Sequence, residues 1–234
     1  MKEGPAIQYI TLSLGITRCF LILCGTQYLL VDTSAVKYYE KFKHELAKHS
    51  ISLSQIKFIF LTHHHTDHTG FLSVLLRESG ARLIVHKNAL PFLAEGVDHQ
   101  AMTGSSGLVR FFMRVKKIFR LYRVCNPVIP DENALLIDSD NDTILRNYGI
   151  PAKIISLPGH TADSIALACD DGNCFAGDAA MTMLGFAKPA YWPLVAENPS
   201  GVRDCWMKLK EQHVKIVHIS HGKSLNINDL TYIH

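Results

Sequence analysis

The stretch His63-His64-His65-Thr66-Asp67-His68 places four histidines and one aspartate within six residues. It directly follows the apolar run 56–61, which has the character of a buried strand. Because alternate side chains of an extended segment share a face, we expect His63 and His65 to turn toward one point and His64 to turn away. Two imidazoles directed at one point form a metal-ligand geometry. The stretch therefore predicts a metal site beyond the end of this strand.

The residues after this stretch indicate a change from strand to helix. Thr69-Gly70 leads into apolar positions at helical spacing, namely Phe71, Leu72, Leu75 and Leu76. Asp67 and His68 would thus lie where the strand gives way to the helix, and they can reach a second point near the first. This spacing suggests two metal ions. The alternative is a solvated polar loop with histidines clustered by chance, although an expression tag would be a terminal and uninterrupted run.

Other polar residues stand at the same kind of place, just beyond an apolar run. They are Asp32 after 28–31, His160 after 154–159, Asp178 after 174–177 and His221 after 216–220. Open α/β sheets place their sites beyond the carboxyl ends of their strands. If these strand ends share an edge, the four residues can converge with the histidine stretch.

Taken in order, these motifs resemble those of the metallo-β-lactamase fold superfamily. The chain carries the family's His-x-His-x-Asp-His at 63–68, Pro-Gly-His-Thr at 158–161, Gly-Asp at 177–178, His-Gly at 221–222 and Val-Asp-Thr at 31–33. Together they cover nearly the whole chain, and five motifs in the right order are far more specific than any one of them. The resemblance implies an α/β fold, a four-layer αβ/βα sandwich of two mixed β-sheets flanked by helices.

The resemblance also implies a role for each matching residue. His63, His65 and His160 would bind one metal ion; Asp67, His68 and His221 would bind the other; Asp178 would bridge the two ions, and Asp32 would support the ligands from behind.

The chemistry follows from this ligand set. Imidazoles and carboxylates suit Zn²⁺, with Zn–N distances of about 2.0–2.1 Å, so we expect two zinc ions; iron and manganese stay open because the set has no thiolate. Two ions about 3.5–4 Å apart can hold a bridging water whose pKa falls toward ~7, which gives a hydroxide nucleophile at neutral pH. Asp67 is the expected catalytic residue, since it can orient the hydroxide or relay a proton to the leaving group.

We therefore expect a dinuclear zinc hydrolase that uses a metal-bridging hydroxide to cleave an ester, thioester or lactone. The alternatives are a phosphodiesterase of the same fold and a non-catalytic metal-binding regulatory module, although no ligand is missing. The commonest true β-lactamases carry Cys at the place of Asp178, which argues against that activity. Quorum-quenching lactonases carry Tyr where this chain has Met181. We also expect too little chain after His221 for the glutathione-binding region of glyoxalase II enzymes.

Length and composition agree with a globular hydrolase. At 234 residues, with 47% hydrophobic residues and a net charge of +3, the chain reads as one domain, 1–234. The uncharged run 19–31 is too short and interrupted to span a bilayer, and the start does not open a signal peptide. The six cysteines show neither a CxxC pair nor a dense framework, so we expect reduced thiols in the cytoplasm. The sequence does not indicate an oligomeric state.

Residues from about 88 to 133 form an expected basic helical insertion. No acid occurs between Asp98 and Asp131, whereas six Lys and Arg residues fall within 110–123, and apolar residues recur at helical spacing over 107–124. This amphipathic helix is a candidate lid over the metal site, a membrane-surface helix or a structural cover. Nucleic acid is not expected as a partner because the rest of the chain is not basic.

The expected partner is a small-molecule substrate, anionic or acyl in character. The loop after Asp178 is rich in large side chains, and Tyr191 and Trp192 are predicted to contact the substrate, although ordinary core packing explains them equally well. Lys223, two residues after the proposed ligand His221, is predicted to bind an anionic group of the substrate.

Overall fold

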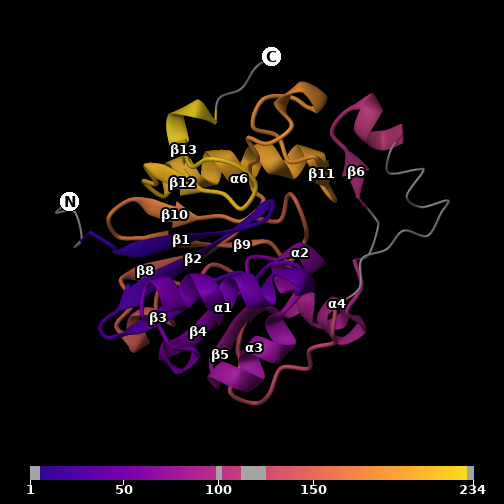
Figure 1. The fold of residues 1–234 in the computed structure, drawn as a ribbon. Coiled ribbons are helices and arrows are strands. Elements are labelled where there is room, and N and C mark those ends of the chain that lie inside the picture. Colours follow the sequence, from indigo (N-terminus) through magenta and orange to yellow (C-terminus); the bar gives the residue numbers. More distant parts are fainter. Residues whose placement is uncertain (1–5, 99–101, 112–124, 231–234) are drawn as a thin grey trace. The chain divides into compact units, whose positions relative to one another are not determined.

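A computed structural model describes residues 6–98, 102–111 and 125–230 of the chain (Figure 1). The chain divides into two compact units. The N-terminal unit comprises residues 7–98 and 123–138, and the C-terminal unit comprises residues 1–6, 99–122 and 139–234. Compactness of the two parts does not decide whether they form one domain, so the single domain 1–234 stays a prediction.

The N-terminal unit contains a six-stranded mixed sheet with the order β1-β2-β3-β4-β5-β7. Its strands are β1 Tyr9–Leu14, β2 Thr17–Cys24, β3 Gln27–Val31, β4 Ile56–Phe60, β5 Arg82–His86 and β7 Leu135–Ile137. The first three strands form an antiparallel meander, whereas β3, β4, β5 and β7 pair in parallel. Because parallel strands share one edge for their carboxyl ends, the residues that follow β3 and β4 come out side by side.

The helices of the N-terminal unit connect these parallel strands. They are η1 Val36–Tyr38, α1 Tyr39–Lys48, η2 Leu53–Gln55, α2 Thr66–Thr69, α3 Leu72–Ser79, η3 Lys87–Ala89 and α4 Leu90–Glu95. Figure 1 shows α1 and α3 lying across the sheet, and their apolar sides join the same hydrophobic core. In α1 the residues Phe42 and Leu46, four positions apart, face this core, while His44 on the opposite side is exposed.

The core of the N-terminal unit is centred on aromatic rings. The ring centroids of Phe42 and Phe71 lie 5.1 Å apart, and Tyr39 stands 5.4 Å from Phe71. Phe42 is fully buried and also packs with sheet residues such as Leu30 and Ile59. These rings join α1 to the segment that follows α2, and they thereby anchor the loop between β4 and α3.

The C-terminal unit contains a five-stranded mixed sheet with the order β13-β12-β10-β9-β8. Its strands are β8 Ala152–Ser156, β9 Ile165–Cys169, β10 Asn173–Phe175, β12 Ile216–His218 and β13 Leu225–Asn226, and a separate two-stranded pair consists of β6 Thr103–Gly104 and β11 Val195–Ala196. β10 and β12 pair in parallel and the other neighbours are antiparallel, so β8, β10 and β12 end at one edge.

One long helix, α6 Pro199–Glu211, covers the sheet of the C-terminal unit (Figure 1). The Asn198 side chain accepts a hydrogen bond from the Gly201 N–H, and Pro199 occupies the first turn, where its missing N–H costs nothing. Trp206 and Leu209 of α6 enter the core. The short helical turns of this unit are η4 Arg146–Tyr148, η5 Gly185–Ala187 and η6 Ile227–Asp229.

The predicted basic helix lies largely outside the described residues. Residues 107–111 are helical, and residues 112–124 are not among those that the structure describes. The roles considered for the helix 107–124 therefore stay predictions. Of the helices formed by residues 6–98, 102–111 and 125–230, none combines the length and the apolar character that crossing a bilayer requires. All six cysteines carry free thiols.

We predict that Phe42→Ala destabilises the protein strongly, because it removes a ring that is fully buried between α1, the sheet and Phe71. The expected loss in the free energy of unfolding is about 3–5 kcal/mol, measured by urea denaturation and circular dichroism. Ile129→Ala is the control in the same unit, because Ile129 is 84% exposed and its loss should cost less than about 0.5 kcal/mol. Equal losses from the two substitutions would contradict this description of the core.

Candidate metal centre

The first group of polar side chains follows the paired strands β3 and β4. Val31 lies opposite Phe60 in the parallel pairing, and the Asp32 N–H donates to the Phe60 carbonyl at 2.9 Å, so the ladder continues one residue past β3. Asp32 has a φ of 58°, a left-handed conformation that residues with a side chain adopt rarely and often at functional sites. The turn directs the Asp32 carboxylate toward Thr62, just beyond β4.

The Asp32 carboxylate organises the loop that follows β4. Its Oδ1 accepts the Thr62 N–H at 2.7 Å, and its Oδ2 accepts the Thr62 hydroxyl at 2.7 Å. The same Oδ2 accepts a hydrogen bond from His68 Nδ1 at 2.8 Å. A fully buried carboxylate is costly unless hydrogen bonds compensate it, so Asp32, Thr62 and His68 form a mutually dependent set.

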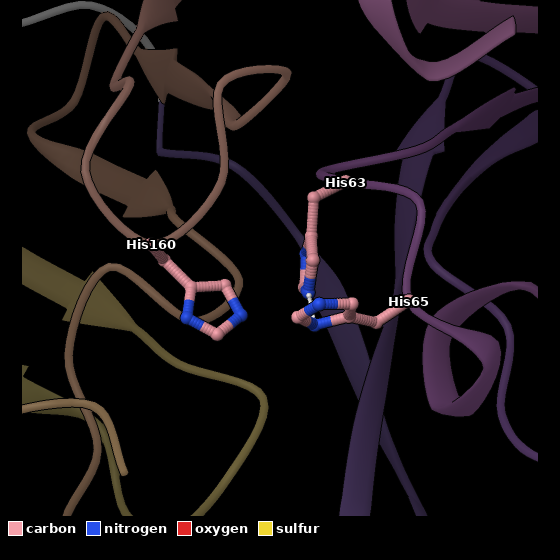
Figure 2. A group of neighbouring side chains, drawn as sticks. All are labelled: His63, His65 and His160. Carbon is pink, nitrogen blue, oxygen red and sulfur yellow. Dashed lines mark hydrogen bonds between the residues drawn. The ribbon is translucent and has the colours of Figure 1, made fainter. Parts of the chain in front are cut away.

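His63 and His65 turn toward each other from this loop (Figure 2). The Thr62 hydroxyl gives its proton to Asp32, so its oxygen can accept from His63 Nδ1, which lies 3.1 Å away. His63 then presents Nε2, which is 3.1 Å from His65 Nδ1. Two nitrogens that share a tetrahedral zinc ion at about 2.0–2.1 Å stand roughly 3.3 Å apart, so this pair is suitable for binding one ion.

His64 has the opposite orientation. Its ring stacks on Phe92 of α4, with centroids 4.0 Å apart and an angle of 19° between the planes. The alternation of side chains that the sequence predicts for this loop is therefore present. His64 is buried, so its role is in packing.

Asp67 and His68 lie on the short helix α2, which begins at Thr66. The sequence pattern predicts a helix only after Gly70, but the chain becomes helical one turn earlier. His68 donates through Nδ1 to Asp32, and its Nε2 is the nitrogen that can bind a metal, as is usual where a carboxylate orients a ligating histidine. Gly70 ends α2 close to another segment, because a Cβ there would lie 2.5 Å from the Ser34 carbonyl oxygen.

The second group of polar side chains belongs to the C-terminal unit. Asp178 follows β10 and His221 follows the neighbouring parallel strand β12, and the Ser220 N–H donates to the Gly177 carbonyl at 3.0 Å. This bond holds the two strand extensions together. His221 Nε2 lies 3.4 Å from Asp178 Oδ2, and both side chains are buried.

His160, on the loop after β8 and drawn in Figure 2, points to the same carboxylate. Its Nδ1 donates to the Val195 carbonyl at 2.8 Å, which leaves Nε2 at 3.6 Å from Asp178 Oδ2. The Glu197 N–H in turn donates to the His160 carbonyl at 2.9 Å. The C-terminal unit thus brings together His160, Asp178 and His221, which are far apart in the sequence.

The loop that carries His221 is fastened to the segment after Asp178. Thr182 N–H donates to the His221 carbonyl at 3.2 Å, and the Thr182 hydroxyl accepts the Lys223 N–H at 2.8 Å. Gly222, between these two residues, has a φ of 125°, a conformation that side chains rarely permit. A Cβ at this position would overlap Thr182 Oγ1.

The three residues predicted to contact the substrate differ in their burial. Tyr191 and Trp192 are half-buried and pack against the core of the C-terminal unit, where Trp192 meets Trp206 edge to face at 5.4 Å. Both residues therefore contribute to core packing, and a contact of either residue with a substrate stays a prediction. Lys223 is exposed, and its proposed contact with an anionic group also stays a prediction.

Two buried basic side chains of the C-terminal unit serve its structure. Burial lowers the pKa of His218 to about 4, and its ring nitrogens are hydrogen-bonded at 2.8 Å to Ser224 and to Asn173. Burial also lowers the pKa of Lys188 to about 8, and its amino group donates to the Met181 carbonyl at 2.7 Å.

Asp98 also contacts helix α2, and no motif in the sequence marks it as a site residue. The Asp98 carboxylate accepts the Thr66 N–H at 2.7 Å and the Thr66 hydroxyl at 3.0 Å, so it contacts the first residue of α2. In the sequence, Asp98 is marked only by its position. It is the last acidic residue before the part of the basic insertion that contains no acid.

The chemistry of these donors fits a metal ion. Histidine nitrogens and aspartate oxygens are the candidate ligands, and none of the six cysteines, all of which the structure describes, is among them. Nitrogen and oxygen donors of this kind bind zinc well and also accept other divalent ions.

Two curated proteins resemble part of the chain. A hydroxyacylglutathione hydrolase from Shewanella pealeana is 30% identical over 120 residues, which cover 51% of this chain and 31% of that protein. A probable metallo-hydrolase, YflN, from Bacillus subtilis is 28% identical over 136 residues, which cover 55% of this chain and 46% of that protein. The chain therefore matches less than half the length of either relative.

Solved structures resemble almost the whole chain. An archaeal metallo-beta-lactamase superfamily protein from Sulfolobus tokodaii has a TM-score of 0.66 at 18% identity and covers 97% of this chain and 84% of its own. The B3 metallo-beta-lactamase BLEG-1 has a TM-score of 0.64 at 14% identity and covers 95% of each chain. At these identities the likeness concerns the fold, and it confirms the predicted α/β metallo-β-lactamase fold.

The family relationship rests on the sequence itself. The profile of the Metallo-beta-lactamase superfamily matches residues 12–221. This range runs through both units and includes all the histidines and aspartates predicted to bind metal. The chain therefore belongs to the metallo-beta-lactamase superfamily.

Proposed function

We propose that this protein is a dinuclear zinc-dependent hydrolase that cleaves an ester, thioester or lactone. The observation that carries the proposal is the position of the Asp178 carboxylate, which has histidine nitrogens at 3.6 Å and 3.4 Å from one of its oxygens. A carboxylate between histidines of two different loops is suited to join two ions. The proposed ligands of the first ion are His63, His65 and His160, those of the second are Asp67, His68 and His221, and Asp178 is shared.

Zinc ions held by these residues would supply a hydroxide nucleophile at neutral pH and would polarise the carbonyl group of the substrate. The protein's own contribution begins with the orientation of the ligands. Asp32 fixes the tautomer of His68, and the Val195 carbonyl fixes that of His160, so each ring directs a lone pair from Nε2.

Asp67 is the proposed catalytic residue. Its carboxylate is partly exposed, unlike the buried Asp32 and Asp178, so it can reach both a ligand position and the substrate. A carboxylate at such a position can accept a proton from the attacking water and deliver it to the leaving oxygen or sulfur.

The names of the two relatives support a hydrolase. One of them is named a hydroxyacylglutathione hydrolase and the other a probable metallo-hydrolase, and both names describe hydrolases. The predicted ligand set is also complete, which favours an enzyme over a regulatory module without turnover.

The proposed chemistry predicts which classes of substrate are cleaved. The zinc-loaded protein should hydrolyse members of a panel of carboxylic esters, thioesters and lactones with a higher kcat/KM than phosphodiesters, because the proposed site polarises a carbonyl group. Asp178→Asn is the control, and it should remove the activity on every substrate. A higher kcat/KM for phosphodiesters would establish the alternative, a phosphodiesterase. If no class of substrate is turned over, a metal-binding regulatory module is favoured.

The proposed ligand set also predicts the metal content of the protein. Metal-replete protein should contain close to two equivalents of zinc per chain by elemental analysis, since the proposed ligands exceed what one tetrahedral ion uses. His160→Ala should weaken the binding of at least one equivalent by more than about 100-fold, beyond the usual effect of losing a supporting residue. His218→Asn, which changes a buried histidine with both ring nitrogens hydrogen-bonded, should leave both equivalents in place. One equivalent in the wild type would rule out the dinuclear site.

The close packing at Gly222 predicts the effect of adding a side chain there. Gly222→Ala should weaken metal binding and lower kcat/KM by about 10–100-fold, because the new methyl group overlaps Thr182 and displaces the loop of His221. Gly149→Ala is the matched control, since Gly149 also has a positive φ, 73°, but no atom within 4 Å of the added methyl group. The control should lose about 1 kcal/mol of stability and keep its activity. Full activity of Gly222→Ala would show that this loop does not position a ligand.

A further inference from the structure

Helix α2 lacks a cap of its own. It has four residues, and its N-cap position is occupied by His65, whose side chain makes no capping hydrogen bond. The first N–H groups of a helix need partners, and Ser, Thr, Asp or Asn at the N-cap usually supply them. A helix of one turn is also too short to be stable by itself. Something outside α2 must therefore hold its first turn in place.

Asp98 supplies this missing cap from another part of the chain. Its Oδ1 accepts the N–H of Thr66 at 2.7 Å, and its Oδ2 accepts the hydroxyl of the same residue at 3.0 Å. A carboxylate at the start of a helix also interacts favourably with the helix dipole, and hydrogen bonds to a charged acceptor are stronger than neutral ones. Asp98 thus replaces the capping side chain that His65 does not provide.

The segment that carries Asp98 is itself held in place. Helix α4 is followed by Gly96, whose N–H donates to the Phe92 carbonyl, and the Gly96 carbonyl accepts the Cys125 N–H at 2.8 Å. Phe92 of the same segment stacks on the ring of His64. The segment 92–98 therefore contacts both neighbours of His65: Phe92 stacks on His64, and Asp98 binds Thr66.

We propose that Asp98 is a positioning residue for Asp67 and His68. By capping Thr66, it fixes the direction in which α2 leaves the loop, and with it the orientation of the two residues that follow. The inference rests on the proposed function, because it takes Asp67 and His68 to be metal ligands. It adds that the binding of the proposed second ion depends on a residue outside the stretch 63–68, at the start of the basic insertion.

The test is a titration of metal-free protein with zinc in competition with a chromophoric chelator, repeated with cobalt(II) and its absorption spectrum. Asp98→Ala should weaken one of the two equivalents by about 10–100-fold, leave the other unchanged, and alter the cobalt spectrum of the weakened site. Asp98→Asn should have a smaller effect, because its remaining oxygen can still accept the Thr66 N–H. Circular dichroism of the metal-free variants establishes that they are folded.

Asp131→Ala is the matched control. Asp131 belongs to the same unit and also accepts a backbone N–H, from Asn133 at 3.0 Å, but in an exposed turn. Its variant should bind both equivalents like the wild type. The inference is overturned if both Asp98 variants bind the two equivalents of zinc like the wild type. It is also overturned if they bind both equivalents equally weakly. Should Asp98→Ala not fold, Asp98→Asn decides alone. Fewer than two equivalents in the wild type would instead contradict the proposed function, and the inference with it.

Discussion

The interaction on which the loop after β4 depends is the hydrogen bonding of the buried Asp32 carboxylate. It accepts the N–H and the hydroxyl of Thr62 and the ring N–H of His68, and each of these bonds satisfies a group that has no access to water. The next residue, Thr33, binds the His68 carbonyl through both its N–H and its hydroxyl. The end of β3 thus determines where the loop after β4 can run. Loss of the carboxylate would leave several buried donors unsatisfied at once.

Each of the two units places polar side chains just beyond the ends of parallel strands. In each of them a pair of parallel strands ends at one edge, and a hydrogen bond just beyond the strands keeps the two extensions together. This bond is Asp32 N–H to Phe60 in the N-terminal unit and Ser220 N–H to Gly177 in the C-terminal unit. The orientation of the histidines is achieved differently, with a carboxylate behind His68 and a backbone carbonyl behind His160. In both cases the hydrogen bond at Nδ1 sets the tautomer and leaves Nε2 as the free acceptor of the ring.

The parts of the fold that could be predicted from the sequence are those decided by neighbouring residues. Apolar runs predicted β4, β8, β10 and β12, and the polar residues after them lie at the strand ends as expected. The start of α2 could not be predicted, because its cap comes from Asp98, which is distant in the chain and lies in an irregular segment. Tyr191 and Trp192 show the other limit: large side chains in a loop after a candidate ligand suit both a substrate wall and a core, and periodicity does not separate the two.

The two histidines of the segment 216–221 show what distinguishes a candidate ligand from a structural residue. Both follow apolar residues of one strand, and both are buried. His218 uses both ring nitrogens in hydrogen bonds to neutral side chains, and burial depresses its pKa to about 4, so the ring is neutral and saturated at pH 7. His221 instead directs Nε2 at the Asp178 carboxylate. Burial alone therefore does not identify a ligand. A ring nitrogen close to a buried carboxylate oxygen is a better candidate, because these two electron-rich atoms need a proton or a metal ion between them.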